Sequence, residues 1–193
     1  MEVHPLTPER FPDLAALFGE GGDPKWCWCM YFRVRGRDWS NSTAEQNRAE
    51  LSALTDGRRH PPGLVGYVDG RAVGWVSLAP RQDYERLASS KILAPVDDTP
   101  VWSIVCFVVS RHARRKGVAS GMLAAAIEYA RKHGATALEA YPVDAGDRRV
   151  AAADAYHGTL SMFESAGFEV VERRQWNSTS AVRPIVRLAL GPG

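Results

Sequence analysis

Apolar residues recur three or four positions apart in three stretches of the chain, and each stretch carries the end signals of a helix. Thr7-Pro8 precedes the first stretch, pairing a capping residue with a favoured first helical residue. Asn41, Ser42 or Thr43 can cap the second. Gly134 ends the third. We therefore expect helices at 8–18, 43–51 and 118–133, with shorter helices at 160–166 and within 84–92.

Between these stretches lie apolar runs of strand character. Asp69-Gly70 separates two of them and is a strong hairpin signal. The order of strand 102–109, helix and strand 137–142 predicts a right-handed crossover that joins two parallel strands. A polar turn at 177–180 separates the last two runs. We expect strands at 63–68, 72–78, 102–109, 137–142, 168–174 and 184–190. This order predicts an α/β fold with a mixed sheet.

Composition adds limits to this pattern. The chain has 193 residues, of which 45% are hydrophobic and 24% charged, and it shows no repeat or boundary, so we expect a single globular domain over 1–193. A net charge of +2 offers no general attraction for nucleic acid. No apolar run reaches the length of a membrane span, the N-terminus lacks a signal core, and the three cysteines are odd in number. These features favour a soluble protein in the reducing cytoplasm.

Candidate chemistry is concentrated in the basic segment 111–116, which joins strand 102–109 to the following helix. The first N–H groups of a helix have no partners within it, and the helix dipole makes this end partly positive. Full positive charges are added by Arg114, Arg115 and Lys116. A pyrophosphate group would fit this arrangement. A merely solvated basic loop is the alternative, and the patterns of other phosphate-binding loops are absent.

Two short motifs then suggest a family. The first, Arg114-Arg115-Lys116-Gly117-Val118-Ala119, stands between a strand and a helix. The second, Met162-Phe163-Glu164-Ser165-Ala166-Gly167-Phe168, ends a short helix. Because the two motifs occur in this order, the chain resembles the GCN5-related N-acetyltransferase (GNAT) superfamily over residues 5–190. The resemblance implies a mixed sheet that splays apart between strands 102–109 and 137–142, with helices on both faces. It also implies that acetyl-CoA, or another acyl-CoA, binds in the opening, with no metal.

By the same resemblance, pantetheine would pair with the backbone of the first strand, and pyrophosphate would bind N–H groups from Arg115 to Ser120. A backbone N–H near Val108 or Val109 would polarise the thioester carbonyl, and we assign this role to Val109. The implied donor-site residues are Phe107, Val108, Val109, Arg114, Arg115, Lys116, Gly117, Val118, Ala119 and Ser120.

Direct attack by an amine on the thioester needs a base for the amine and an acid for the departing thiolate. In many members of the family a tyrosine of the second motif is the acid, and here Phe163 stands in its place. Tyr156 or Tyr141 is the alternative acid, and His157 or water the base, although each residue type more often has a packing or surface role. Cys106 raises the option of a covalent acyl-enzyme, but a strand cysteine is usually a small buried hydrophobe.

The acceptor should contact Trp26, Trp28 and Tyr31, together with the loops 80–100 and 143–156 and the final hairpin. Core packing is the competing interpretation of the aromatic segment 25–32. A metal site on Cys27 and Cys29 is disfavoured because no second pair of ligands exists. Acidic residues in loops are usually only solvated. A cation could nevertheless be attracted by the carboxylates of Asp97, Asp98, Asp144 and Asp147.

The resulting expectation is an N-acyltransferase that moves acetyl from acetyl-CoA to a primary amine of a small molecule. A peptide or protein amine, or an antibiotic amine, is equally compatible with the residues. A CoA-binding sensor or scaffold that has lost catalysis is the alternative from another class, and Phe163 supports it. We expect no nucleic-acid or membrane partner, and the sequence leaves a homodimer open.

Overall fold

The computed structural model describes residues 1–56, 60–144 and 156–191. These residues form a seven-stranded sheet in the order β1-β2-β3-β4-β5-β7-β6. Only β4 and β5 pair in parallel among the described strands, and the other neighbours are antiparallel. In chain order the strands are β1 (Glu2–Pro5), β2 (Gly63–Val68), β3 (Arg71–Pro80), β4 (Trp102–Val109), β5 (Ala137–Ala140), β6 (Glu169–Arg174) and β7 (Arg183–Ala189).

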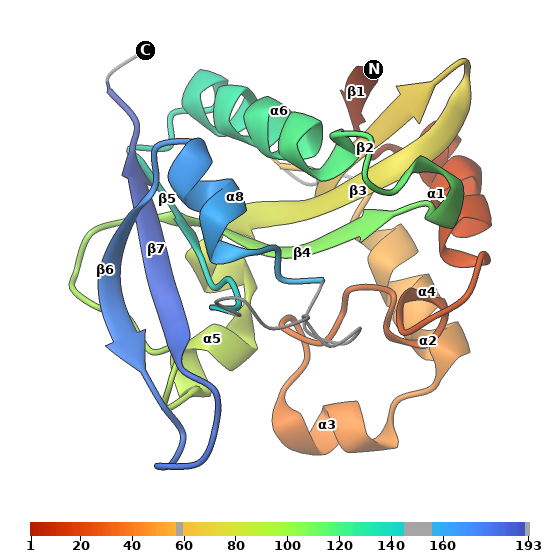
Figure 1. Cartoon of the computed structure of the whole chain (residues 1–193). Helices are drawn as coiled ribbons and strands as arrows, with labels where there is room; N and C mark the ends of the chain where they lie inside the picture. The colour runs from red at the N-terminus through yellow and green to blue at the C-terminus, as the bar shows by residue number, and fades with distance from the viewer. Residues whose placement is uncertain (57–59, 145–155, 192–193) are drawn as a thin grey trace.

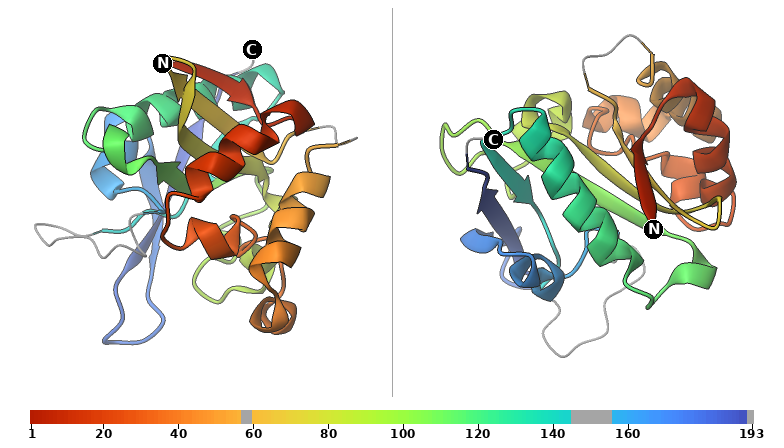
Figure 2. Two further views of the ribbon diagram at one scale, coloured as in Figure 1. Left: turned by 90° about the vertical axis from the view of Figure 1, so that its right-hand side faces the viewer. Right: turned by 90° about the horizontal axis from the view of Figure 1, so that it is seen from above.

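Helices cover both faces of the sheet (Figures 1 and 2). On one face α6 and α8 share a buried cluster with the sheet, and on the other face α1 and the segments around α2 and α5 pack in two further clusters. The helical elements are η1 (Pro8–Arg10), α1 (Phe11–Phe18), α2 (Pro24–Cys27), α3 (Gly36–Asn41), α4 (Ala44–Ala53), η2 (Arg81–Asp83), α5 (Glu85–Ser89), η3 (Arg111–Ala113), α6 (Val118–Lys132) and α8 (Leu160–Ser165).

The predicted mixed α/β fold is confirmed, with small differences at its margins. Asp69 and Gly70 both have positive φ, 49° and 73°, which is the backbone of a type I′ hairpin turn. Thr43 is the cap of α4 and forms a capping box with Gln46. Strand β5 ends at Ala140, before the expected 142. The pattern did not predict β1 or α3, because β1 is short and α3 carries no apolar face of its own.

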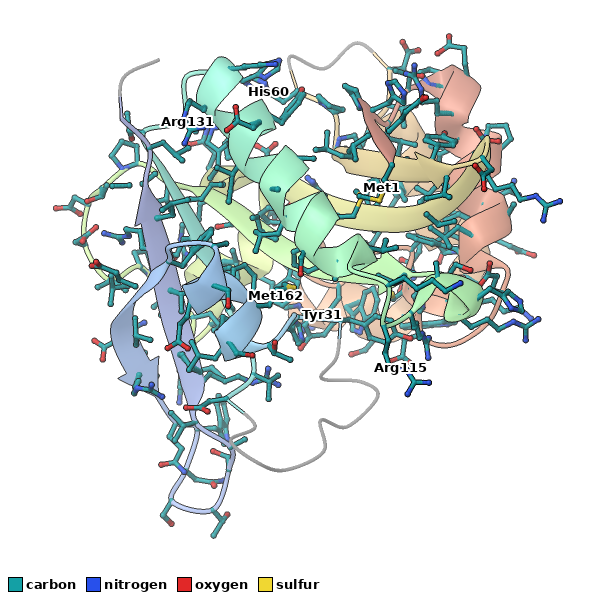
Figure 3. All side chains as sticks on the ribbon, turned by 45° about the horizontal axis from the view of Figure 1, so that its top comes forward. Met1, Tyr31, His60, Arg115, Arg131 and Met162 are labelled. Atoms are coloured by element: carbon teal, nitrogen blue, oxygen red, sulfur yellow. The ribbon has the colours of Figure 1, made fainter. Side chains whose placement is uncertain are left out.

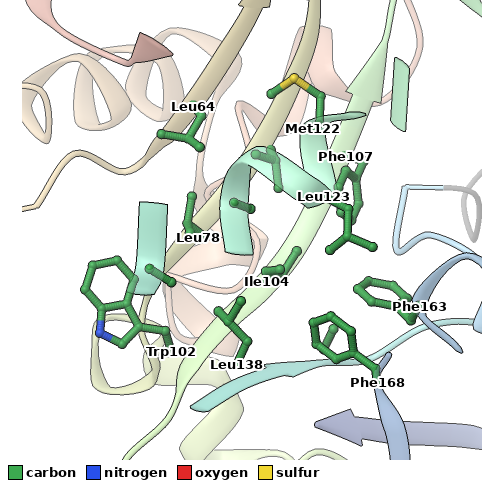
Figure 4. Packing of buried hydrophobic residues seen from close by; sticks show 14 of the residues in the cluster. Leu64, Leu78, Trp102, Ile104, Phe107, Met122, Leu123, Leu138, Phe163 and Phe168 are labelled. Carbon is green, nitrogen blue, oxygen red and sulfur yellow. The ribbon is translucent and has the colours of Figure 1, made fainter. Parts of the chain in front are cut away.

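Two glycines of the sheet face helix α6, so its side chains pack directly against the sheet backbone. A Cβ atom at Gly66 would lie 2.4 Å from the sulfur of Met122, and one at Gly74 would lie 2.9 Å from a methyl carbon of Val118. The apolar face of α6 is thereby buried against β2, β3 and β4 (Figure 4). This contact fixes the N-terminal end of α6 beside the end of β4.

The predicted separation of β4 from β5 is present. Among the described residues the two strands pair only from Trp102 to Ile104, so on this side the second half of β4 has an edge that pairs with no described strand. In the same region the pairing of β3 with β4 passes from Cys106 directly to Ile104 and skips Val105. This β-bulge shifts the alternation of side chains, so that Val105 and Cys106 both face the side of α2 and α5.

A buried ionic network ties the segment 81–100 to the C-terminal half of the sheet. Glu139 on β5 is 1% exposed and accepts hydrogen bonds from Arg81, at 2.8 Å, and from Arg187, at 2.9 Å. Arg81 also donates to the carbonyls of Leu87 and Leu93, on the connection that contains α5. The arginines therefore fix a long connection that has little regular structure of its own.

None of the helices in the described ranges combines the length and the apolar character that crossing a membrane requires.

Candidate active site

The connection from β4 to α6 has the backbone of an anion site. Arg115 and Gly117 have positive φ, 60° and 77°, and α6 begins at the next residue, Val118. No side chain of the described residues caps this end of α6, and its first helical hydrogen bond runs from the Gly121 N–H to the Gly117 carbonyl. The N–H groups from Gly117 to Ser120 therefore have no partner within the helix and can bind phosphate oxygens.

Glu20, at the end of the first helical region, holds this loop in place. One carboxylate oxygen accepts from the Ser110 hydroxyl at 2.9 Å, and the other accepts from the Arg111 N–H at 3.1 Å. A carboxylate that orders the backbone before a ligand arrives reduces the entropy lost on binding. The sequence offered no sign of this role because Glu20 is distant along the chain.

A cavity of about 610 Å³ opens along this loop, and we call it the donor cavity. Most of the predicted donor-site residues line it, but Val108 and Lys116 are not among its lining residues: Val108 packs into the core on the opposite face of the sheet, and Lys116 is exposed. The lining consists of Phe107, Val109, Ala113, Arg114, Arg115, Gly117, Val118, Ala119, Ser120, Tyr156, Gly158, Thr159 and Met162. Two guanidinium groups, a free helix N-terminus and apolar walls fit the pyrophosphate and pantetheine of a CoA thioester.

The open edge of β4 corrects part of the predicted backbone pairing. The Phe107 N–H donates to the Tyr156 carbonyl at 2.7 Å, so it is already occupied. Successive N–H groups of a strand point to opposite edges, which directs the Val109 N–H to the same open edge and the Val108 N–H toward β3. Val109 is therefore the better placed of the two residues that we considered for polarising a carbonyl.

Gly158 is a donor-cavity residue that the sequence did not reveal. Its φ is +75°, and a Cβ atom there would lie 2.7 Å from the Met162 methyl and 2.9 Å from the ring of Phe163. Its carbonyl accepts from the Val143 N–H, which connects the end of β5 to this wall. Glycine before a helix could have signalled a turn, but only the folded chain shows the close packing.

We expect Gly158→Ala to lower the free energy of unfolding by about 2 kcal/mol, because backbone strain and overpacking add together. Urea denaturation measures the loss. Gly70→Ala is the matched control, since Gly70 has a similar φ of +73° but nothing within 4 Å of its Cβ position. Equal losses in the two variants would show that packing against Met162 and Phe163 contributes nothing.

A second cavity, of about 540 Å³, lies on the other face of β4, and we call it the aromatic cavity. Trp26 and Tyr31, two of the residues expected to contact the acceptor, line it. Trp28 instead packs in the core between Phe11 and Phe18, with ring centroids 5.9 and 5.4 Å away. The lining consists of Asp23, Pro24, Trp26, Cys27, Cys29, Tyr31, Phe32, Trp39, Val105, Cys106, Tyr156 and His157.

Tyr156 lines both cavities and therefore stands where they adjoin. Burial raises the pKa of its phenol, although a hydrogen bond with the backbone of Asp23 partly opposes the effect. The hydroxyl lies beside the loop at Gly22, where an added Cβ atom would come within 2.6 Å of it. The raised pKa keeps the phenol protonated at neutral pH and also makes it a weaker acid than an ordinary tyrosine.

His157 follows directly and lines the aromatic cavity. Its Nδ1 lies 3.2 Å from the Val105 carbonyl, which can only accept, so the proton of the neutral ring is on Nδ1 and the lone pair is on Nε2. The ring meets Phe32 edge to face at 5.7 Å. This arrangement orients the imidazole at the wall of the cavity.

Tyr141, a candidate acid, and Phe163, at the position of the family's usual acid, both have structural roles. Tyr141 is not placed to act as the acid: it is 2% exposed, and its hydroxyl donates to Glu139 while Arg81 and Ser103 bond to it. Burial raises its pKa. Phe163 is fully buried against Phe107 and Phe168, which accounts for an apolar residue at this position.

Cys106 faces the aromatic cavity, on the opposite side of β4 from Phe107 and Val109. The predicted separation of Cys106 from Phe107 and Val109 is present, because these residues alternate regularly after the bulge, while the bulge at Val105 separates Cys106 from the face of Trp102 and Ile104. Within 1–56, 60–144 and 156–191 no group of three or more potential ligand side chains is arranged to hold a metal ion.

The acidic loop residues are used mainly in ion pairs. Asp97 pairs with Arg187 at 2.7 Å, and this hydrogen bond lowers the pKa of Asp97. Asp144 pairs with Arg173 at 2.6 Å, while Asp98 is exposed. Asp147 and the rest of the expected acceptor loop over 145–155 lie outside the described residues.

A larger cavity, of about 760 Å³, lies at the opposite end of β4, where β4 and β5 are still paired. His60 is at its wall, against Trp102 at 4.7 Å. Figure 3 shows His60 and Arg131 at one end of α6 and Arg115 and Met162 at the other. Because the anion site and the open edge of β4 are at the latter end, we place the active site there.

Comparison with known proteins agrees with this geometry. The profile described as Acetyltransferase (GNAT) family matches residues 25–158. A search of curated protein sequences finds no match.

Solved structures share the fold at low identity. A polyamine N-acetyltransferase from Drosophila melanogaster is similar with a TM-score of 0.62 and 10% identity, covering 98% of this chain and 99% of that chain. A ribosomal-protein-alanine N-acetyltransferase from Brucella melitensis is similar with a TM-score of 0.58 and 20% identity, covering 98% and 100%. The family match spans more than half of the chain, and the donor-site geometry agrees with it. The chain therefore belongs to the GNAT acetyltransferase family and is an N-acetyltransferase.

Proposed function

We propose that this N-acetyltransferase uses acetyl-CoA to acetylate the primary amine of a small molecule that binds in the aromatic cavity. The observation that carries the proposal is the position of Tyr156, whose side chain borders both the donor cavity and the aromatic cavity. A donor on one side and an acceptor on the other would meet beside this residue, at the open edge of β4.

Each step of the reaction has a candidate group. Bound acetyl-CoA supplies the electrophilic thioester carbonyl. The Val109 N–H stabilises negative charge on the carbonyl oxygen. Nε2 of His157 takes the proton of the amine, directly or through water, and the Tyr156 hydroxyl supplies a proton to the departing sulfur.

The cavity walls favour an acceptor with an apolar or flat body. Trp39 meets Trp26 and Tyr31 edge to face at 4.6 and 5.3 Å, so these rings form a continuous aromatic wall. Aromatic faces attract cations, and the Asp23 carboxylate lies in the same lining. An organic amine that arrives as an ammonium ion suits this surface. The fold alone does not identify the acceptor, because similar structures include both a polyamine N-acetyltransferase and a ribosomal-protein-alanine N-acetyltransferase.

Replacing Tyr156 by phenylalanine should reduce kcat about tenfold. General acids usually contribute more, but a thiolate is a relatively good leaving group. The dissociation constant of coenzyme A should stay nearly constant, because the ring remains in place. Steady-state kinetics and calorimetry measure the two quantities. Tyr129→Phe, in the last turns of α6 and outside the linings of both cavities, is the control. An unchanged kcat in the Tyr156 variant would remove the phenol from the mechanism.

A turnover assay tests the function itself. Acetyl-CoA is offered with aromatic amines, aliphatic diamines and a peptide that begins with alanine, and product acetylation is followed by mass spectrometry. Acetylation of the aromatic amines above the peptide supports the proposal. Preference for the peptide would assign a protein substrate. Binding of coenzyme A without transfer to any acceptor would favour the sensor interpretation.

A further inference from the structure

Three cysteines line the aromatic cavity, and the proposed reaction uses none of them. The sulfurs of Cys29 and Cys106 are 3.2 Å apart although 77 residues separate them in the chain, and the Cys29 thiol donates a hydrogen bond to Cys106. All three cysteines are free. A disulfide needs a sulfur–sulfur distance of about 2.05 Å, so a shift of about 1.1 Å would suffice.

The position of Cys106 depends on the β-bulge. With simple alternation Cys106 would share a face with Trp102 and Ile104, which pack against α6. Because the register skips Val105, Cys106 instead faces the aromatic cavity, partly exposed. A β-bulge disrupts the regular hydrogen bonding of the strands, and such bulges are frequent next to active sites.

The position of Cys29 is also enforced. Trp28 and Cys29 both have left-handed φ, 46° and 54°, which is strained for residues other than glycine. The buried indole of Trp28 anchors this turn, and the indole N–H of Trp75 donates to the Cys29 sulfur at 3.2 Å. The buried Trp28 indole and the hydrogen bond from Trp75 together hold the thiol toward Cys106 against this backbone strain.

We propose that Cys29 and Cys106 form a reversible disulfide on the wall of the aromatic cavity when a hydroperoxide enters it. Cys106 is the partly exposed sulfur and reacts first. Its thiolate attacks one peroxide oxygen, the O–O bond breaks, and with one proton the products are a sulfenic acid and water. The Cys29 sulfur then attacks the Cys106 sulfur, the S–O bond breaks, and the hydroxyl leaves with the Cys29 proton as a second water. Two thiols and one hydrogen peroxide thus yield one disulfide and two waters.

The bond would join the turn after α2 to β4. It would fix the wall of the aromatic cavity while the donor cavity, on the other face of β4, keeps its lining. An effect on the acceptor rests on the proposed function, but formation of the bond does not. The two are therefore tested by separate measurements.

The experiment uses the full chain treated with hydrogen peroxide. Remaining thiols are alkylated, and the protein is digested with trypsin without reduction. Two of the three thiols should be lost in an intramolecular cross-link, and dithiothreitol should restore them. Cys27→Ser is the matched control, because it leaves only Cys29 and Cys106; a link between peptides 26–33 and 92–111 then identifies the pair.

Cys29→Ser should stop the cross-link but leave a sulfenic acid on Cys106 that dimedone labels. Cys106→Ser should abolish both the cross-link and the dimedone label. Retention of all three reactive thiols in the wild-type chain would overturn the proposal. So would a bond between Cys27 and Cys29, or a cross-link formed only between two chains. Coenzyme A affinity of the oxidised protein should change by less than about twofold, as expected for separate sites.

Discussion

Replacing Gly117 by glutamate is expected to raise the dissociation constant of coenzyme A at least about 100-fold. Gly117 has φ +77° and directly precedes α6, and its carbonyl accepts the first bond of that helix. A glutamate side chain there would place a carboxylate beside the N–H groups meant for phosphate. Losing about two charge-assisted hydrogen bonds costs roughly 3 kcal/mol, and each 1.4 kcal/mol is about tenfold. Isothermal titration calorimetry measures the change.

Gly134→Glu is the matched control for this variant. Gly134 ends the same helix, also has φ +77°, and has nothing within 4 Å of its Cβ position, as is true of Gly117. The two variants share the backbone strain and the added charge but differ in the end of α6 that they alter. Coenzyme A binding should be nearly normal in the Gly134 variant. Equal losses in both would mean that α6 itself was damaged and that the phosphate site is misassigned.

Glu139→Gln is expected to lower the free energy of unfolding by about 3–5 kcal/mol. Glu139 is 1% exposed and pairs with Arg81 and Arg187, whose side chains are 14% and 15% exposed. Removing one partner of a buried ionic group leaves uncompensated charge, which is the costly case. In a chain of this size the loss corresponds to a fall in Tm of roughly 10 °C. Urea denaturation and calorimetry measure both quantities.

The exposed pair of Glu128 and Arg131 is the control for this second variant. Both side chains are well exposed, at 60% and 38%, so Glu128→Gln should change the stability by less than about 1 kcal/mol. The Glu139 variant should also loosen the connection 81–100, because Arg81 holds the carbonyls of Leu87 and Leu93. A loss near that of the control would show that the network contributes specificity rather than stability.

Much of the fold was predictable because its signals are local. The apolar face of α6, the Asp69-Gly70 turn and the run 102–109 each fix an element with little help from the rest of the chain. The donor site followed from the same locality, since the N–H groups of a helix terminus and the neighbouring arginines are consecutive in sequence. The fold and the candidate anion site were therefore predictable from the sequence alone.

The acceptor side was less predictable because it is assembled from distant segments. Trp28 and Tyr31 are near neighbours in one aromatic segment, yet Trp28 is in the core and Tyr31 is at the cavity. Tyr141 and Tyr156 were equal candidates, and only the contacts of Tyr141 with Glu139, Arg81 and Ser103 separate them.

Local signals were enough to predict the family, most of the order of elements and a candidate anion site, because periodicity, turn residues and a helix terminus act over a few residues. Which side chains meet across β4 depends instead on the folded chain. A single skipped residue in the pairing of β3 with β4 turns Cys106 toward Cys29, and the end of pairing after Ile104 opens the edge that carries the Val109 N–H. Register and strand divergence are set by packing over the whole sheet, so no local pattern encodes them.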